Sequence, residues 1–343
     1  MPSAGRFPAG PGAGSVRRVI DAHHHLWDLA AREHRWLMGG QAWATDDELA
    51  RLRRSFTLAD LAPLAAEAGV TGTVVIETAA EPWETPDLLA LAAGRNPYGA
   101  SGRARGDGAP GGGPVGAGDE PAAAGGLLAG VVGWTDLAAP AVADAVAGLR
   151  ALPGGGFLCG IRHPVLAEPD PGWLARPVVL RGLRALAAEG LGFDLVTLPH
   201  QLPAAVTAAR SVPELTFVLD HLGGPSAESG QGATAGPWAS AIRDLAALPN
   251  VACKLSGAHT SPARASGLRP YYETVLDSFG PGRLMFGSDW PVSTLAASNR
   301  QVCDVYRELT AGLSAAEQDA IFERTARRVY RLREPERTRQ PGR

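Results

Sequence analysis

The stretch VIDAHHHLW, residues 19–27, decides how the rest of the sequence is interpreted. It contains the pattern Asp-x-His-x-His at Asp21, His23 and His25. Its first residues suit a buried strand, and successive side chains of a strand point to opposite faces, so His23 and His25 share a face and His24 points away. Two imidazoles placed in this way can bind a metal ion or polarise a carbonyl group from one side, although so short a motif also arises by chance.

Further apolar runs of strand length follow along the chain. Together with the first they make eight, over residues 16–23, 69–77, 127–134, 155–163, 191–198, 215–221, 250–257 and 283–289. Ala- and Leu-rich segments of helical period lie between them, such as 57–69, which Thr57 begins as N-cap, and 177–190, which Gly190 ends. Other helices are expected to start near Pro86, Pro140, Pro203, Pro237, Pro270 and Ser298. This alternation predicts an α/β fold, a single-domain (β/α)8 TIM barrel. A doubly wound open sheet usually has fewer strands, and the glycine fingerprint for dinucleotides is absent after the first run.

Three segments have a composition that cannot bury enough apolar surface to offset the entropy of ordering. We expect residues 1–15 and 333–343 to be disordered tails, and residues 94–126 to be a low-complexity insertion in one loop. The barrel domain would then span residues 16–332.

Composition excludes several classes of protein. The formal charge is −3 with no run of like charges, which argues against a nucleic-acid surface. No apolar run reaches the roughly 18 residues of a membrane helix, and the N-terminus lacks the apolar core of a signal peptide. The cysteines (Cys159, Cys253 and Cys303) are odd in number and far apart, so we expect free thiols. These features predict a cytoplasmic protein that acts on a small molecule, without nucleic-acid or membrane partners, and they are compatible with a homo-oligomer.

Polar side chains gather where the predicted strands end, which is the edge at which such barrels carry their active sites. They are His23, His25, Arg162, His163, His200, Asp220, His221, Lys254, Ser256 and Asp289. For His163 a backbone hydrogen bond, and for His200 a helix-capping role, is an alternative explanation. Asp220 alternates away from His221, so we expect it to orient a neighbour.

Two of these residues carry the strongest signals. Asp289, in FGSDWP, is a strand-end carboxylate that no nearby lysine or helix cap explains, so a functional role is favoured. Lys254 is the only lysine among 32 basic residues, and we expect its ammonium group to reach the barrel interior or mouth and meet a carboxylate or the substrate. Trp27 and Trp290, near the same strand ends, suit either the core or the walls of a substrate pocket.

Several segments together resemble the amidohydrolase superfamily, and most closely its fuconolactonase-like group of sugar and aromatic lactone hydrolases. The matching segments, in order, are DAHHHLWD, GVVGW, GIRH, FVLDHLGGP, NVACKLSG and MFGSDWP. The resemblance implies a (β/α)8 barrel with Asp289 as general base and with His23, His25 and His221 around the substrate carbonyl or a metal ion. It also implies that Arg162 contacts substrate.

The chain departs from the two-metal members of this superfamily, which bridge their metals with a carboxylated lysine on strand four. Strand four here reads FLCGIRH, and Lys254 lies on strand seven, so no binuclear centre is expected. A single divalent ion such as Zn²⁺ could be held by His23, His25, His200 and Asp289. The sequence leaves open whether the reaction needs a metal.

Three functions remain. The first is a lactonase of carbohydrate metabolism that opens the lactone ring of a sugar acid or related carboxylic acid, with Asp289, His221, His23 and His25 as catalytic residues and water as nucleophile. Its substrate contacts would be Arg162, Lys254, His200, Trp27 and Trp290. The second is a zinc-dependent decarboxylase of an aromatic or enoic acid on the same barrel, and the third is a non-catalytic binding barrel. A serine hydrolase is not supported, because the sequence has no Gly-x-Ser-x-Gly.

Overall fold

The computed structural model describes residues 18–41, 43–98, 126–225, 236–257 and 264–333. The two expected tails lie outside the described residues except at residue 333, and so do residues 99–125 of the expected insertion.

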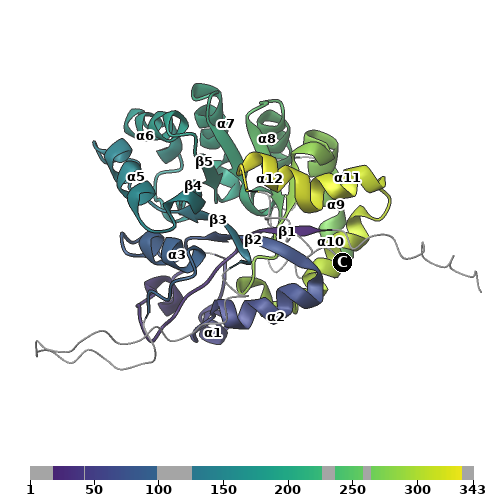
Figure 1. The fold of residues 1–343 in the computed structure, drawn as a ribbon. Helices are drawn as coiled ribbons and strands as arrows, with labels where there is room; N and C mark the ends of the chain where they lie inside the picture. Colours follow the sequence, from purple (N-terminus) through teal and green to yellow (C-terminus); the bar gives the residue numbers. More distant parts are fainter. Residues whose placement is uncertain (1–17, 42, 99–125, 226–235, 258–263, 334–343) are drawn as a thin grey trace, which may run out of the picture.

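Parallel strands form one sheet whose order follows the sequence, from β1 to β8 (Figure 1). The strands are β1 (Val19–His24), β2 (Val70–Ile76), β3 (Leu128–Gly133), β4 (Leu158–His163), β5 (Gly192–Leu195), β6 (Thr216–Leu219), β7 (Val251–Leu255) and β8 (Leu284–Phe286). Each lies within one of the eight predicted runs, apart from the extension of β1 to His24.

The two ends of the sheet meet just beyond β8. The His25 amide donates to the Trp290 carbonyl at 2.7 Å, and the Asp289 amide donates to the His23 carbonyl at 2.7 Å. These two bonds, which we call the seam, bring β1 beside β8 and close the barrel, so the predicted (β/α)8 fold is confirmed.

Helices surround the strands (Figure 1). They are α1 (Asp46–Arg51), α2 (Leu58–Ala68), α3 (Glu84–Ala92), α5 (Val142–Ala151), α6 (Pro177–Ala188), α7 (Leu202–Ser211), α8 (Pro237–Ala246), α9 (Arg264–Phe279), α10 (Asn299–Thr310), α11 (Ala315–Asp319) and α12 (Thr325–Val329). As predicted, α2 begins after Thr57, in a capping box with Asp60, and it ends at Gly69 in the left-handed conformation (φ 74°). The prediction was wrong at Pro270, which lies inside α9 rather than at its start.

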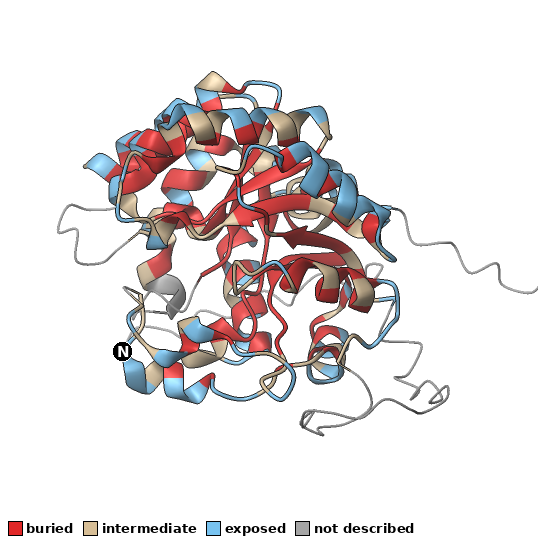
Figure 2. Cartoon of the chain, turned by 90° about the vertical axis from the view of Figure 1, so that its left-hand side faces the viewer, coloured by how far each residue is buried: buried red, intermediate tan, exposed pale blue. Residues whose placement is uncertain are grey.

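The apolar core has two parts, and the strands are buried on both faces (Figure 2). The larger part packs the helices against the outside of the barrel. The smaller part fills the barrel with side chains from the strands and from the C-terminal segment, namely Ile20, Ala22, Val74, Ile76, Val132, Val218, Ala252, Met285, Ala326, Tyr330 and Leu332. The C-terminal segment therefore closes one end of the interior, and the polar strand ends lie at the other.

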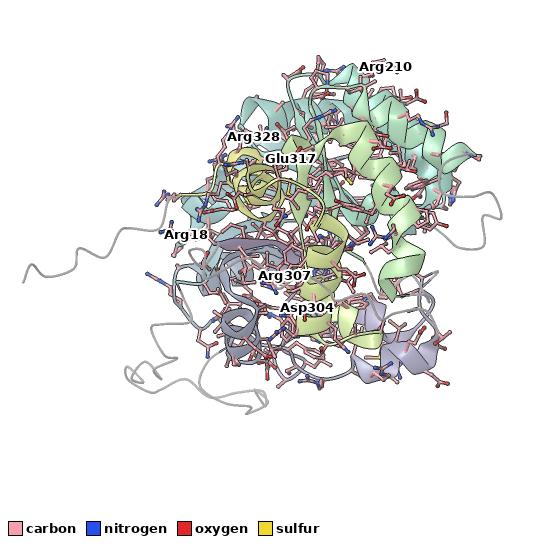
Figure 3. All side chains as sticks on the ribbon, turned by 90° about the vertical axis from the view of Figure 1, so that its right-hand side faces the viewer. Arg18, Arg210, Asp304, Arg307, Glu317 and Arg328 are labelled. Carbon is pink, nitrogen blue, oxygen red and sulfur yellow. The ribbon has the colours of Figure 1, made fainter. Side chains whose placement is uncertain are left out.

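Charged side chains lie on the outer helices (Figure 3). On α10, Arg307 Nη1 lies 3.2 Å from Asp304 Oδ1. Within the described part of the chain, none of the helices has the length and apolar character needed to cross a membrane.

Candidate active site

The side chains of His23, His25 and Asp289 meet at the seam. The two Nε2 atoms of the histidines lie 3.2 Å apart, and Asp289 Oδ1 lies 3.6 Å from the His23 Nε2 and 3.4 Å from the His25 Nε2. All three residues are buried. The sequence predicted this group, and the structure brings it together.

A register shift in β1 between Asp21 and His24 sets the direction of the histidines. His24 points away from the group, as expected, and its Nε2 lies 3.0 Å from Thr73 Oγ1. Asp21 Oδ1 accepts from the His23 amide at 3.1 Å and from the Ser288 amide at 2.8 Å, so this carboxyl group ties β1 to the residues after β8.

Two side chains of the site stand on strained backbone. Asp289 has φ 57° and His221 has φ 53°, a left-handed conformation that non-glycine residues adopt rarely, Asp and His more readily than most, and that is frequent at active sites. His221 Nδ1 lies 2.9 Å from Ser256 Oγ and 4.0 Å from Asp289 Oδ2. The His221 side chain is 18% exposed, compared with 2% for Asp289, so this histidine lies on the side that a substrate can reach.

Arg162, at the end of β4, is held by protein carboxylates. Its Nε donates to Glu77 Oε1 at 2.7 Å, its Nη2 donates to the Glu77 carbonyl, and its Nη1 donates to Asp220 Oδ2 at 3.3 Å. The same Nη1 lies 3.5 Å from His23 Nε2, so the guanidinium borders the site. Its charge is already paired, so it suits a carbonyl or hydroxyl oxygen better than a substrate carboxylate.

Lys254 and Asp220 lie behind His23, on the side away from Asp289. The Lys254 ammonium is fully buried between the carboxylates of Asp194 and Asp220. Of the two contacts predicted for it, a carboxylate or the substrate, the structure shows the first. Asp220 Oδ1 lies 3.4 Å from His23 Nδ1, which agrees with the expectation that Asp220 orients a neighbour.

Three predicted substrate contacts lie apart from this group. His200 is exposed in a short 3-10 turn, residues 199–201. Trp27 is buried in an aromatic cluster, with its ring 5.1 Å from the Phe56 ring, and Trp290 packs against the same Phe56 at 5.5 Å. Both tryptophans therefore belong to the core. The sequence had left the core and the walls of a substrate pocket as the two alternatives for them.

His163 forms side-chain contacts instead of the backbone hydrogen bond suggested from its sequence position. Its ring stacks on Trp173 at 4.2 Å, Trp134 Nε1 donates to its Nδ1 at 3.3 Å, and its Nε2 lies 2.7 Å from Glu168 Oε1. It serves to hold the loop after β4.

Burial and neighbouring charges set the ionisation of the site. Burial lowers the pKa of His23 well below its ordinary value, and the nearby Lys254 charge lowers it further. Burial opposes ionisation of Asp220, but the neighbouring Lys254 and Arg162 cations outweigh it and hold the pKa of Asp220 well below its usual range. Burial raises the pKa of Asp194 to about 6. At neutral pH the site therefore holds a neutral His23 beside an ionised Asp220.

The positions of the ligand atoms at the seam suit one metal ion. A tetrahedral zinc with bonds of about 2.0–2.2 Å places its ligand atoms about 3.3–3.6 Å apart. The separations among His23, His25 and Asp289 are 3.2, 3.6 and 3.4 Å. Among the described residues, His23 also belongs to a second possible group, with Asp220 and His221. His200 belongs to neither group, so its predicted role as a ligand has no support in this geometry.

Sequence reasoning missed Glu77, Asp194 and Tyr330. Tyr330 Oη donates to Asp194 Oδ2 at 2.8 Å, and Asp194 Oδ2 lies 2.5 Å from Lys254 Nζ. A signal was available for the two acids, because Glu77 ends one apolar run and Asp194 interrupts another, and acids are almost never fully buried unless they are paired.

The chain is similar to known proteins over most of its length. The model of the amidohydrolase family matches residues 122–332. An L-fucono-1,5-lactonase of Burkholderia multivorans is 35% identical over 328 residues, 92% of this chain and 97% of the relative. An L-fucono-1,5-lactonase of Burkholderia ambifaria is 34% identical over 280 residues, 81% of each chain.

A solved structure supports the fold. The crystal structure of an amidohydrolase from Burkholderia multivorans with bound zinc superposes with a TM-score of 0.75 at 32% identity, and the match covers 92% of this chain and 99% of that one.

Proposed function

Because this chain belongs to the amidohydrolase family, we propose that it is a hydrolase that opens the lactone ring of a sugar acid. The observation that carries the proposal is the meeting of buried His23, His25 and Asp289 at the barrel seam. A carboxylate beside two imidazoles provides a base for water and a donor for a carbonyl oxygen. The names of the relatives indicate a 1,5-lactone.

The proposed reaction begins with water. Asp289 accepts a proton from water while the water oxygen attacks the lactone carbonyl carbon, and such a positioned base typically contributes about 10²–10⁴-fold. The negative charge that develops on the carbonyl oxygen is stabilised by N–H groups of His23 and Arg162, each worth roughly 2.7–4 kcal/mol if it acts like a typical oxyanion donor. The ring C–O bond then breaks, and its oxygen takes the proton that Asp289 accepted. The product is a hydroxy acid, whose new carboxyl group ionises and releases a proton to solvent.

The charges around the site favour an uncharged substrate. Among the described residues that surround His23, the cations are Arg162 and Lys254, and the carboxylates are Asp21, Glu77, Asp194, Asp220 and Asp289. Each cation already contacts two carboxylates. An anionic lactone would therefore meet a site of net negative charge, whereas a polyhydroxy lactone would bind through hydrogen bonds.

A bound divalent ion would be held by His23, His25 and Asp289, and it would supply Lewis-acid polarisation of the carbonyl group. Asp289 would still accept the proton from water, and Arg162 would still border the substrate oxygen.

The experiment compares uncharged aldono-1,5-lactones, L-fucono-1,5-lactone among them, with lactones that carry additional carboxylates, and follows proton release with a pH indicator. We expect turnover of the uncharged lactones. Asp289→Asn should lower kcat by at least about a hundredfold, as expected for a lost general base. Asp304→Asn, which makes the same chemical change on the exposed face of α10, is the control.

Two outcomes would contradict the proposal. If Asp289→Asn raised KM and left kcat unchanged, Asp289 would not be the base. If the enzyme released CO₂ from aromatic or enoic acids, opened no lactone, and lost all activity on chelation, it would be the decarboxylase.

A further inference from the structure

Lys254, on β7, reaches the Nδ1 edge of His23 from inside the barrel. Its Nζ lies 3.2 Å from His23 Nδ1, 2.5 Å from Asp194 Oδ2 and 3.0 Å from Asp220 Oδ1. All four side chains are fully or almost fully buried. An ammonium group has donors and no acceptor, so the ring nitrogen that it contacts must be the acceptor. A neutral His23 then carries its proton on Nε2.

The contacts at the opposite edge of the His23 ring, the Nε2 edge, also indicate that the proton of His23 is on Nε2. His25 Nδ1 lies 2.9 Å from the Ile76 carbonyl oxygen. A carbonyl oxygen can only accept, so His25 carries its proton on Nδ1 and has a lone pair on Nε2. His23 Nε2 lies 3.2 Å from His25 Nε2, so in the protein without a metal ion between these two nitrogens His23 must be the donor.

We infer that Lys254 is a positioning residue that fixes the proton of His23 on Nε2, the nitrogen that faces Asp289. The hydrogen bonds then run in one direction, from Lys254 to His23, from His23 to His25, and from His25 to the Ile76 carbonyl. The inference about the proton is independent of the reaction. Only its catalytic consequence rests on the proposed function.

Asp220 and Arg162 provide the competing contacts. Asp220 Oδ1 lies 3.4 Å from His23 Nδ1 and would favour a proton there, but the Lys254 ammonium is nearer to Nδ1 and pairs with the same oxygen at 3.0 Å. Arg162 Nη1 lies 3.5 Å from His23 Nε2, but it has a nearer acceptor in Asp220 Oδ2 at 3.3 Å. Lys254 therefore keeps Asp220 from imposing the other tautomer.

Asp194 and Tyr330 hold the lysine in place. Tyr330 follows α12, and its Oη donates to the same Asp194 oxygen that contacts Lys254 Nζ. The Lys254 ammonium also lies 5.4 Å from the centre of the Tyr330 ring. The C-terminal segment thus restricts the ammonium group whose position decides the tautomer.

The fixed proton divides the roles of the two histidines. In the free protein the His23 N–H is donated to His25 Nε2, and Asp289 Oδ1 lies 3.6 Å from the same His23 nitrogen. A carbonyl oxygen that enters between them would accept this N–H in place of His25, from a ring that carries no charge. His25 presents a lone pair and is ready to bind a metal ion. His23 can bind the same ion only after its proton has left Nε2.

Nuclear magnetic resonance of ¹⁵N-labelled histidine rings tests the inference in the full chain, because protonated and bare ring nitrogens have distinct shifts. A His23→Gln variant assigns the His23 signals by their loss. We expect the wild type, freed of metal ions with a chelator, to show a protonated Nε2 and a bare Nδ1. A proton on Nδ1, or on both nitrogens, would overturn the inference.

Substitution of Lys254 tests whether this residue sets the tautomer. In Lys254→Met, Asp220 remains beside Nδ1, and the His23 proton should move to Nδ1. Tyr330→Phe removes the bond to Asp194 and leaves Lys254 against His23, so it should keep the wild-type tautomer. An unchanged tautomer in Lys254→Met would refute the role of the lysine. If that variant fails to fold, Lys254→Met combined with Asp194→Asn removes the carboxylate left without its partner and is measured instead.

Kinetics separates this inference from the proposed function. In Lys254→Met we expect kcat to fall about a hundredfold with little change in KM, as for the loss of one oxyanion donor. A wild type with the expected tautomer and no lactonase activity would refute the function and keep the inference. A wild type that is an active lactonase but carries the His23 proton on Nδ1 would refute the inference and keep the proposed function.

Discussion

Gly287, directly after β8, leaves just enough space for His23. A Cβ atom at this position would lie 2.6 Å from the His23 Cβ and 3.2 Å from the His23 amide nitrogen, whereas ordinary contact begins at 3.4 Å. The backbone of Gly287 does not have the positive φ that favours glycine, so Gly287→Ala changes only the packing. To restore ordinary contact, the backbone of His23 or of Gly287 must move by about 0.8 Å.

This displacement determines how much stability and how much activity Gly287→Ala should lose. Forcing one methyl group into a packed interior typically lowers the free energy of unfolding by about 1–3 kcal/mol. A displacement near 1 Å at a reacting group can lower the rate about a hundredfold. We therefore expect Gly287→Ala to fold and to lose about two orders of magnitude in kcat/KM on an aldono-1,5-lactone.

The assay measures proton release at several lactone concentrations, together with unfolding in denaturant. Gly282→Ala is the matched control, because it makes the same change just before β8 and its Cβ would meet nothing within 4 Å. Full activity in Gly287→Ala, or an equal loss in Gly282→Ala, would show that crowding of His23 does not limit the reaction.

Two further predictions concern buried charges. Burial raises the pKa of Asp21 from 3.8 to about 6. The stability that the protonated Asp21 contributes is fully present below pH about 3.8 and is lost as the pH rises to about 6. Asp21→Asn keeps an acceptor oxygen and does not ionise. Between pH 4 and 7 its free energy of unfolding, measured in denaturant titrations, should therefore rise by up to about 3 kcal/mol relative to wild type. A pH-independent difference would contradict this. Lys254→Arg should lose lactonase activity nearly as fully as Lys254→Met, because a planar guanidinium does not fit a fully buried site with three acceptors within 3.2 Å of one nitrogen. An active Lys254→Arg variant would contradict it.

The sequence was sufficient to predict the barrel and the group at the seam. Strand alternation placed His23 and His25 on one side, and the strand-end rule brought Asp289 to them. The sequence could not predict that the charge of Arg162 is paired with Glu77 and Asp220, because this pairing across the barrel depends on how the strands are staggered.

The errors have a common cause. His200 follows a predicted strand and was therefore assigned to the site, but β5 ends at Leu195, and the chain runs on to an exposed turn before His200 is reached. Asp194 points into the barrel from within β5, where strand-end reasoning does not look. Reasoning from strand ends finds polar residues at the mouth of the barrel and misses those within the strands, such as Asp194, that point into its interior.

The seam links activity to the opening and closing of the barrel. Its two hydrogen bonds use the peptide groups of His23, His25 and Asp289, whose side chains form the site, and the carbonyl of Trp290. His23 and Asp289 lie at opposite ends of the barrel sequence. Such long-range contacts are the slowest to form, so activity in a refolding sample should return only when the ring of strands has joined. In the folded protein, the rate at which the His25 and Asp289 amide hydrogens exchange with solvent would measure how often the seam opens. The site is separated, and therefore inactive, while the seam is open.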